Sequence, residues 1–193
     1  PYTTLFRSPN YRSGVDGLRV SNSTKGGVTF AASTTQNGIH MISVVLGVEA
    51  VDGDPYARFV ATSSLMNYVV RTFVSSIVVK EGDPYGKSKA SVMDGKSETV
   101  LAVAKKDFYI VEKQGSQAEP KIQFKSTQES FKAPVKSGTT LGKLHYTDPD
   151  KIGRGYLEDQ EPTVDMVAGR TIEKSFFLKV WWNEFVRYVN EKL

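Results

Sequence analysis

The sequence of 193 residues contains no cysteine, which excludes disulfide bonds, thiolate catalysis and cysteine-based zinc sites. It holds two histidines, His40 and His145, and neither has a partner at the i, i+4 spacing of a helical metal site. We therefore predict no metal site and expect each histidine to be an isolated strand residue. No apolar run reaches the roughly 20 residues that a membrane-spanning helix needs.

Motifs of enzymatic and nucleic-acid chemistry are also missing. No serine stands in a Gly-x-Ser-x-Gly turn, and Lys25-Gly26-Gly27 is too short for a phosphate loop and leads into a strand. The net charge is +4, and the basic residues are scattered among acidic ones along the sequence. We therefore expect no cofactor and no nucleic-acid partner. The mild positive charge is compatible with an anionic membrane or cell wall.

The first eight residues, PYTTLFRS, carry no initiator methionine and read like the translation of a common DNA-sequencing adapter. We expect residues 1–8 to be a non-native leader and leave them out of the fold prediction. Resequencing the locus tests this: an open reading frame that encodes these eight residues natively would contradict it.

An antiparallel meander is predicted after this leader. Residues 15–20 (VDGLRV) and 27–34 (GVTFAAST) have extended character, and Gln36-Asn37-Gly38 is a hairpin signal because Asn-Gly favours positive φ. The apolar run over residues 39–48 (IHMISVVLGV) predicts a central strand that is covered on both faces.

A helix is predicted next, over residues 56–73, with Asp54 as its N-cap and Pro55 at its first position. Its apolar residues recur near helical spacing, so it should pack across the meander. Asp52 and Asp54 could also indicate a cation-binding loop. No ligand series follows at calcium-loop spacing, which favours capping and turn roles for both residues.

From residue 75 onward, short β-rich runs alternate with turn signals and no helical pattern intervenes. The expected strands are residues 76–80, 89–93, 99–104, 108–113, 121–126, 141–147 and 163–168. Strands at this spacing predict a small all-β, sandwich-like domain over residues 75–170. With an antiparallel-sheet segment over residues 9–74 and a helix after residue 171, the fold class is α+β.

The last segment, residues 171–193, predicts an amphipathic helix. At about 100° per residue, its apolar and aromatic side chains fall on one half of the helix. The side chains expected to bind a membrane are Phe177, Leu178, Trp181, Trp182, Phe185, Tyr188 and Val189. This face suits a membrane interface, where Trp and Tyr prefer to lie, and a protein core is the alternative surface.

The order of these elements resembles the penicillin-binding D-alanyl-D-alanine carboxypeptidases, which are serine-type and of low molecular mass. The stretches that carry the resemblance are Ser13-Gly14-Val15-Asp16-Gly17-Leu18, Asn37-Gly38-Ile39, Pro55-Tyr56-Ala57-Arg58-Phe59, Ala133-Pro134-Val135-Lys136-Ser137-Gly138 and residues 176–183 (FFLKVWWN). The last of these is similar to the membrane anchor of streptococcal family members. Each stretch alone is weakly specific, but their collinear order is specific.

The resemblance implies a three-part enzyme with a serine transpeptidase-like domain, a β-rich stalk and an amphipathic anchor. It places the nucleophilic serine of the Ser-x-x-Lys motif, and the Ser-x-Asn motif, in sequence that precedes this chain. The third motif, Lys-Thr-Gly, falls by gapless register on Arg19-Val20-Ser21. Arg19 keeps a cation but is no proton shuttle, Val20 lacks the hydroxyl donor, and Ser21 places a side chain where the family has glycine.

The resemblance implies that the parent enzyme removes the terminal D-alanine from peptidoglycan stem peptides and binds β-lactams, at the extracytoplasmic face of the membrane as a peripheral protein. We expect this chain itself to be inactive. The alternative is a non-catalytic, membrane-anchored, wall-associated scaffold module in which the motif has decayed.

Overall fold

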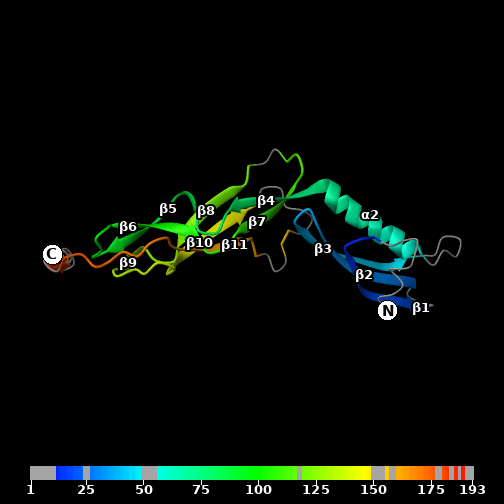
Figure 1. Cartoon of the computed structure of the whole chain (residues 1–193), viewed down its shortest axis with the longest axis horizontal. Coiled ribbons are helices and arrows are strands. Elements are labelled where there is room, and N and C mark those ends of the chain that lie inside the picture. The colour runs from blue at the N-terminus through cyan, green and yellow to red at the C-terminus, as the bar shows by residue number, and fades with distance from the viewer. Residues whose placement is uncertain are drawn as a thin grey trace. The chain divides into compact units, whose positions relative to one another are not determined.

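The computed structural model describes residues 12–23, 27–48, 56–116, 119–148, 155–156, 160–176, 180–182, 185–186 and 188–189. The chain divides into two compact units. The N-terminal unit comprises Pro1–Ser76 and Val111–Ser116, and the β-rich unit comprises Ile77–Ile110 and Gln117–Leu193. Figure 1 shows the elements of each unit. The finer division at residues 8, 74 and 170 stays a prediction.

The predicted meander is confirmed in the N-terminal unit. Strands β1 (Val15–Ser23), β2 (Gly27–Gln36) and β3 (Ile39–Val48) form an antiparallel sheet in the order β1-β2-β3. Asn37 and Gly38 turn the β2–β3 hairpin with φ of 52° and 75°. These positive φ values are the reason that Asn-Gly fits this position.

Strand β3 differs from the prediction of a central strand covered on both faces. Among the described residues it is an edge strand, and buried and exposed side chains alternate along it. Ile42, Val44 and Leu46 are 62%, 57% and 74% exposed. The sequence does not reveal which side chains are buried, because hydrophobic residues occupy both faces of the strand. Only the face toward the helix is covered here.

Helix α2 (Ala57–Thr72) packs on β2 and β3, as predicted. Tyr56 occupies its N-cap position without a side-chain capping hydrogen bond, and the helix begins at Ala57. The predicted cap Asp54, with Pro55 and Asp52, lies outside the described residues. Met66 of α2 is 1% exposed among the core residues of the sheet.

The β-rich unit is confirmed as almost entirely β. Its strands are β5 (Pro84–Met93), β6 (Thr99–Ala104), β8 (Lys121–Ser126), β9 (Ser130–Lys132), β10 (Thr140–Thr147) and β11 (Thr163–Ala168). Two further strands, β4 (Phe73–Val79) and β7 (Phe108–Lys113), form a separate two-stranded sheet that the division between the units crosses. Strand β4 follows directly on α2, three residues before its predicted start, and the short strand β9 was not predicted.

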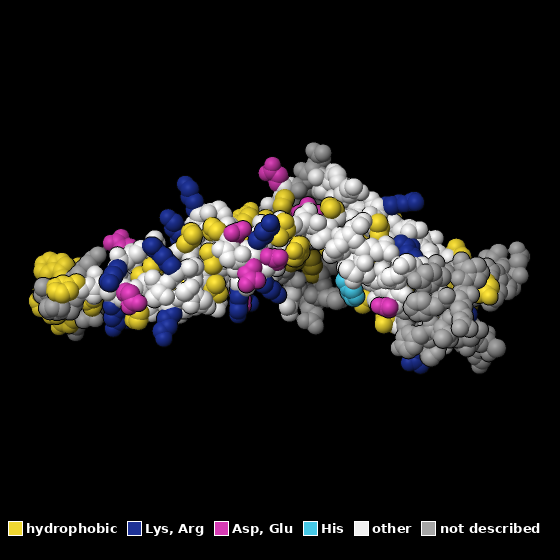
Figure 2. All heavy atoms as spheres, viewed as in Figure 1, with side chains coloured by type: hydrophobic (Ala, Val, Ile, Leu, Met, Phe, Trp, Pro, Cys, Tyr) yellow, Lys and Arg dark blue, Asp and Glu magenta, His cyan; other side chains and the backbone are white. Residues whose placement is uncertain are grey.

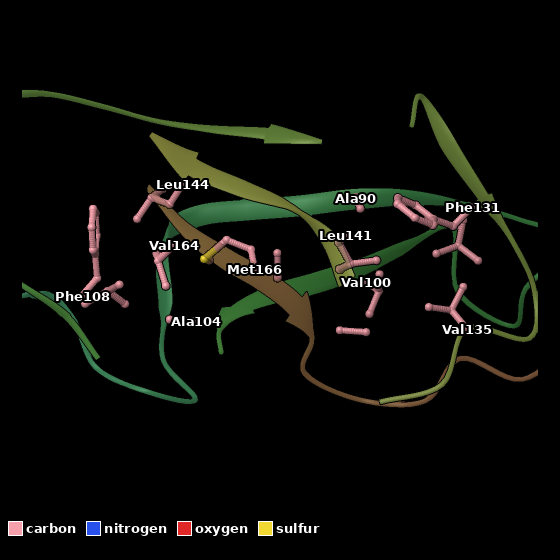
Figure 3. Packing of buried hydrophobic residues seen from close by; sticks show 14 of the residues in the cluster. Ala90, Val100, Ala104, Phe108, Phe131, Val135, Leu141, Leu144, Val164 and Met166 are labelled. Carbon is pink, nitrogen blue, oxygen red and sulfur yellow. The ribbon is translucent and has the colours of Figure 1, made fainter. Parts of the chain in front are cut away.

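The expected two-sheet sandwich is replaced by a curled sheet. Six strands are hydrogen-bonded in one order, β8-β10-β11-β6-β5-β9. Strands β5 and β8 come into contact although three strands separate them in this order, so the sheet curls around its own core. Figure 3 shows that core, where Leu141, Leu144 and Met166 lie among strands on more than one side. Outward side chains therefore lie on a convex surface.

The start of the predicted C-terminal helix is also corrected. Ile172 is 4% exposed and bridges Val135, and its backbone N–H and C=O both bond with that residue. Lys174 bridges Gly95 through the flanking residues: the Lys96 N–H donates to the Glu173 carbonyl, and the Ser175 N–H donates to the Asp94 carbonyl. Residues 171–175 thus belong to the β-rich unit, because Ile172 fills a core position that a surface helix would leave empty. Helical conformation is described at residues 180–182, 185–186 and 188–189.

Candidate functional site

The tripeptide Arg19-Val20-Ser21 lies on β1, at an edge of the sheet. Its residues stand opposite Ala31, Phe30 and Thr29 of β2, respectively. The register shifts between Gly17 and Arg19, so Leu18 has no opposite residue and forms a β-bulge. No described strand pairs with the outer edge of β1. Such an edge offers backbone N–H and C=O groups to an extended peptide.

The pleat separates the three side chains of the tripeptide. Val20 shares the face of Phe30, which is buried under α2, whereas Arg19 and Ser21 share the opposite face with Ala31 and Thr29. All three side chains are exposed, and Val20 is 51% exposed. A ligand paired with this edge would therefore meet a guanidinium and a hydroxyl on one side and an isopropyl group on the other.

A buried arginine of α2 contacts this strand. Arg58, in the first turn of α2, is 7% exposed and donates a long hydrogen bond of 3.5 Å to the Ser21 carbonyl. Its guanidinium also lies 5.8 Å from the centre of the Phe59 ring. The sequence marks Arg58 only as part of a family-like stretch. Its contact with Ser21 depends on how the helix packs on the sheet, which local spacing does not reveal.

A second feature of the N-terminal unit is an open apolar groove of about 290 Å³ between β3 and α2. Met41, Ser43 and Val44 line it from β3, and Leu65 and Tyr68 from α2. The hydroxyl of Ser43 is buried and has no hydrogen-bond partner in the described part of the chain. An unpaired buried hydroxyl costs about 1–3 kcal/mol, so the groove is suited to further covering chain.

The described residues contain no group of three or more His, Asp or Glu side chains that could hold a metal ion. His40 stands on β3 of the N-terminal unit, and His145 on β10 of the β-rich unit. The structure therefore gives each histidine the predicted place on a strand. Lys25 and Gly26 lie outside the described residues, and Gly27 begins β2.

The C-terminal segment exposes large aromatic side chains. Trp181, Trp182 and Tyr188 are 62%, 59% and 61% exposed. The ring centre of Phe185 lies 6.0 Å from that of Trp181 and from that of Trp182. Figure 2 shows hydrophobic side chains gathered at this end of the chain.

Two further residues of the predicted membrane-binding face, Phe177 and Leu178, lie outside the described residues. Val189 is half-buried. In the described part of the chain, no helix is long and apolar enough to cross a membrane.

The β-rich part of the chain matches a known protein family. A family model described as the C-terminal domain of penicillin-binding protein 5 matches residues 73–174, more than half of the chain. The chain therefore belongs to this family, and the resemblance seen in the sequence is confirmed. The matched segment ends at Lys174, the last residue that bridges to the β-rich unit.

Individual relatives agree with this membership. A solved structure from Streptococcus pneumoniae, described as a peptidoglycan synthesis regulatory factor (PBP3), is 42% identical with a TM-score of 0.81, over 90% of this chain and 47% of that one. The D-alanyl-D-alanine carboxypeptidase DacA of Haemophilus influenzae is 28% identical over 133 residues, which are 68% of this chain and 32% of the relative. Penicillin-binding protein 5 of that organism shares the fold, with a TM-score of 0.58 at 23% identity over 83% of this chain and 43% of its own.

A further relative, the D-alanyl-D-alanine carboxypeptidase DacC of Escherichia coli, is 25% identical over 167 residues, 86% of this chain and 38% of its own. The chain thus spans about a third of the length of these carboxypeptidases and about half of the streptococcal structure.

Proposed function

We propose that this chain forms the C-terminal part of a D-alanyl-D-alanine carboxypeptidase of the penicillin-binding class. The observation that carries the proposal is the match of 42% identity and TM-score 0.81 over 90% of the chain, which spans both compact units. The names of the carboxypeptidase relatives support the same reaction. In this proposal, residues 9–74 belong to the catalytic domain, residues 75–175 form the stalk, and the segment after residue 175 anchors it, since Ile172 and Lys174 bridge to the β-rich unit.

The proposed substrate is a peptidoglycan stem peptide that pairs with the free edge of β1. A serine hydroxyl from another part of the enzyme attacks the carbonyl carbon of the penultimate D-alanine, and the bond to the terminal D-alanine breaks. The leaving amine takes up a proton, and water then hydrolyses the ester. Arg19 would hold the terminal carboxylate. A β-lactam would acylate the same serine.

The tripeptide departs from Lys-Thr-Gly in ways that weaken this site. Val20 donates no hydrogen bond, and the loss of one such partner in a closed site costs about 1–3 kcal/mol. Arg19 is longer and stays protonated. These departures favour a second candidate, a non-catalytic wall-associated scaffold module. The test is the substitution Val20→Thr in the full-length protein. A higher rate of acylation by penicillin would support the enzyme, and an unchanged rate would support the scaffold module.

The open groove and the outer face of β3 support a longer catalytic domain. The streptococcal structure contains about as much chain again as is matched here. We assign the additional half of such a protein as the occupant of the groove, where it would cover Ile42 and Val44. A hydrophobic dye should bind the present chain and lose binding when Ile42→Lys and Val44→Lys are combined. Unchanged dye binding would contradict this occupant.

The exposed aromatic segment supports peripheral attachment to a membrane, at its extracytoplasmic face. Trp and Tyr side chains prefer the headgroup region, where an apolar ring and a polar N–H or O–H are both accommodated. Flotation with anionic liposomes tests this, comparing the full chain with one that ends at Phe176. The truncation must not begin at Ile172, because that residue is part of the β-rich core. Equal flotation of the two proteins would refute the anchor.

A further inference from the structure

Six lysines point outward from the strands of the β-rich sheet, in two groups: on the neighbouring strands β8 and β10, and on the neighbouring strands β5 and β9. Along each strand, every second side chain faces the core, and the residues between them point outward. On β5, for example, Ser88, Ala90 and Val92 are buried and Lys89 is exposed. We name the resulting set the lysine face; its members are Lys87 and Lys89 of β5, Lys121 and Lys125 of β8, Lys132 of β9 and Lys143 of β10.

Two of these lysines are directly opposite each other. Lys125 of β8 pairs with Lys143 of β10, and both are exposed. Like charges in this position destabilise a sheet. On its other side Lys143 stands opposite Asp165, whose carboxylate also lies 3.8 Å from the Lys105 ammonium. The ion pair of Asp165 is thus with Lys105, and in the described part of the chain no ion pair includes a member of the lysine face.

The pKa of the neighbouring His145 is affected by the same lysines. It stands on β10 between Gln123 of β8 and Thr163 of β11. Partial burial lowers the pKa of His145, and the nearby Lys125 and Lys143 lower it further, against the opposing effect of Glu161. Glu161 accepts a hydrogen bond from Thr147 at 2.9 Å. At His145, burial and the two lysines thus outweigh the carboxylate of Glu161.

We propose that the lysine face binds a linear, phosphate-bearing polyanion that carries no bases. Lys87 and Lys89 are two positions apart on β5, about 6.6–7 Å, and Lys125 and Lys143 are opposite each other, about 4.8 Å apart between strands. This spacing suits closely repeated charges. Lysine is a hydrated point charge on a flexible stem and imposes no fixed geometry on its partner. The face thus suits a flexible chain of phosphates held by charge alone.

Two other anionic partners fit this surface less well. Proteins that bind single-stranded nucleic acid stack its bases on aromatic side chains. The described outward positions of β5, β6, β8, β10 and β11 carry no Phe, Tyr or Trp. A flat bilayer would touch only part of a curled sheet, whereas a flexible polymer can follow its convex surface.

Binding of long-chain inorganic polyphosphate to the full chain tests the proposal. The test variant combines Lys125→Gln and Lys143→Gln. The control variant combines Lys96→Gln and Lys174→Gln, which removes the same charge from exposed positions outside the strands of the lysine face. The test variant should bind about tenfold more weakly at low salt. Its plot of log affinity against log salt concentration should be shallower by about 1.4–1.8, because two cations are removed. The control should match the unmodified chain.

Thermal unfolding separates binding from structure. Because Lys125 and Lys143 repel each other, the test variant should unfold no earlier than the unmodified chain. Absence of polyphosphate binding, or equal losses in the two variants, would overturn the proposal. Tighter binding to single-stranded DNA than to polyphosphate would also overturn it. Tighter binding to phosphatidylglycerol vesicles than to polyphosphate, if it depends on Lys125 and Lys143, would overturn it as well. These outcomes do not depend on whether the chain belongs to an active carboxypeptidase.

Discussion

The ring of Phe30 meets the ring of Phe59 edge-on, with centres 5.0 Å apart and planes at 79°. Phe30 is 2% exposed and stands opposite Val20, so the main aromatic contact between sheet and helix lies directly beside the candidate active-site strand. Replacement of Phe30 by alanine should lower the free energy of unfolding of the N-terminal unit by about 3–5 kcal/mol. Chemical denaturation measures this loss. Leu46→Ala, at a side chain 74% exposed, is the control and should change stability by less than about 0.5 kcal/mol.

A glycine on β10 is required by close backbone approach. A Cβ at Gly142 would collide with the carbonyl oxygen of Lys125, which belongs to the backbone and cannot move aside. At Gly169, the nearest atom to an added Cβ is a side-chain methyl of Val103, at 3.0 Å. Gly142→Ala should therefore destabilise the β-rich unit by about 1–3 kcal/mol or more, and Gly169→Ala by less. Similar thermal shifts for the two variants would contradict this contact.

His145 makes the stability of the β-rich unit depend on pH. Its pKa in the folded protein is lowered from 6.5, first by burial and then by Lys125 and Lys143. Below pH 6.5 the unfolded chain binds a proton that the folded chain resists, so the free energy of unfolding should fall as the pH drops through the folded pKa. NMR titration of the ring should show a midpoint below 6.5, and Lys125→Gln should raise it. A midpoint at or above 6.5 would contradict the positive potential of this surface.

Tyr156 gives the opposite dependence at high pH. Burial and the nearby carboxylate of Asp148, which accepts a hydrogen bond from the phenol at 3.5 Å, raise its pKa to about 12. The stabilisation is present below pH 10 and is lost as the pH rises from 10 through 12. Absorbance of tyrosinate should show a late step near pH 12 that Tyr156→Phe removes. A titration complete by pH 11 would show that the phenol is not held in this way.

Strong local patterns predicted much of the fold. Asn37-Gly38 fixed the hairpin because its positive φ values suit few other residues. The alternating strands β6, β7, β8 and β11 appear at their predicted residues, because burial on one face imposes a period of two. The predictions failed where long-range packing decides: Ile172 extends the β-rich core, and β3 is exposed on one face although its sequence is apolar on both.

The candidate site was predicted only in part. The position of Arg19-Val20-Ser21 on an edge strand follows from resemblance and local extended character. The support that Arg58 gives to Ser21 depends on helix packing. The sequence does not predict the lysine face, because its residues are far apart along the chain and only the sheet register makes Lys125 and Lys143 neighbours.

Labelling with fluorescent penicillin tests the central claim most directly, that this chain completes a carboxypeptidase without supplying its nucleophile. Two proteins are compared: the present chain alone, and a chimera in which the additional half of the streptococcal relative precedes it and Arg19-Val20-Ser21 is changed to Lys-Thr-Gly. Circular dichroism and gel filtration confirm that each is folded. We expect no label on the chain alone and stoichiometric label on the chimera. Labelling of the chain alone, or a folded chimera that stays unlabelled, would contradict it.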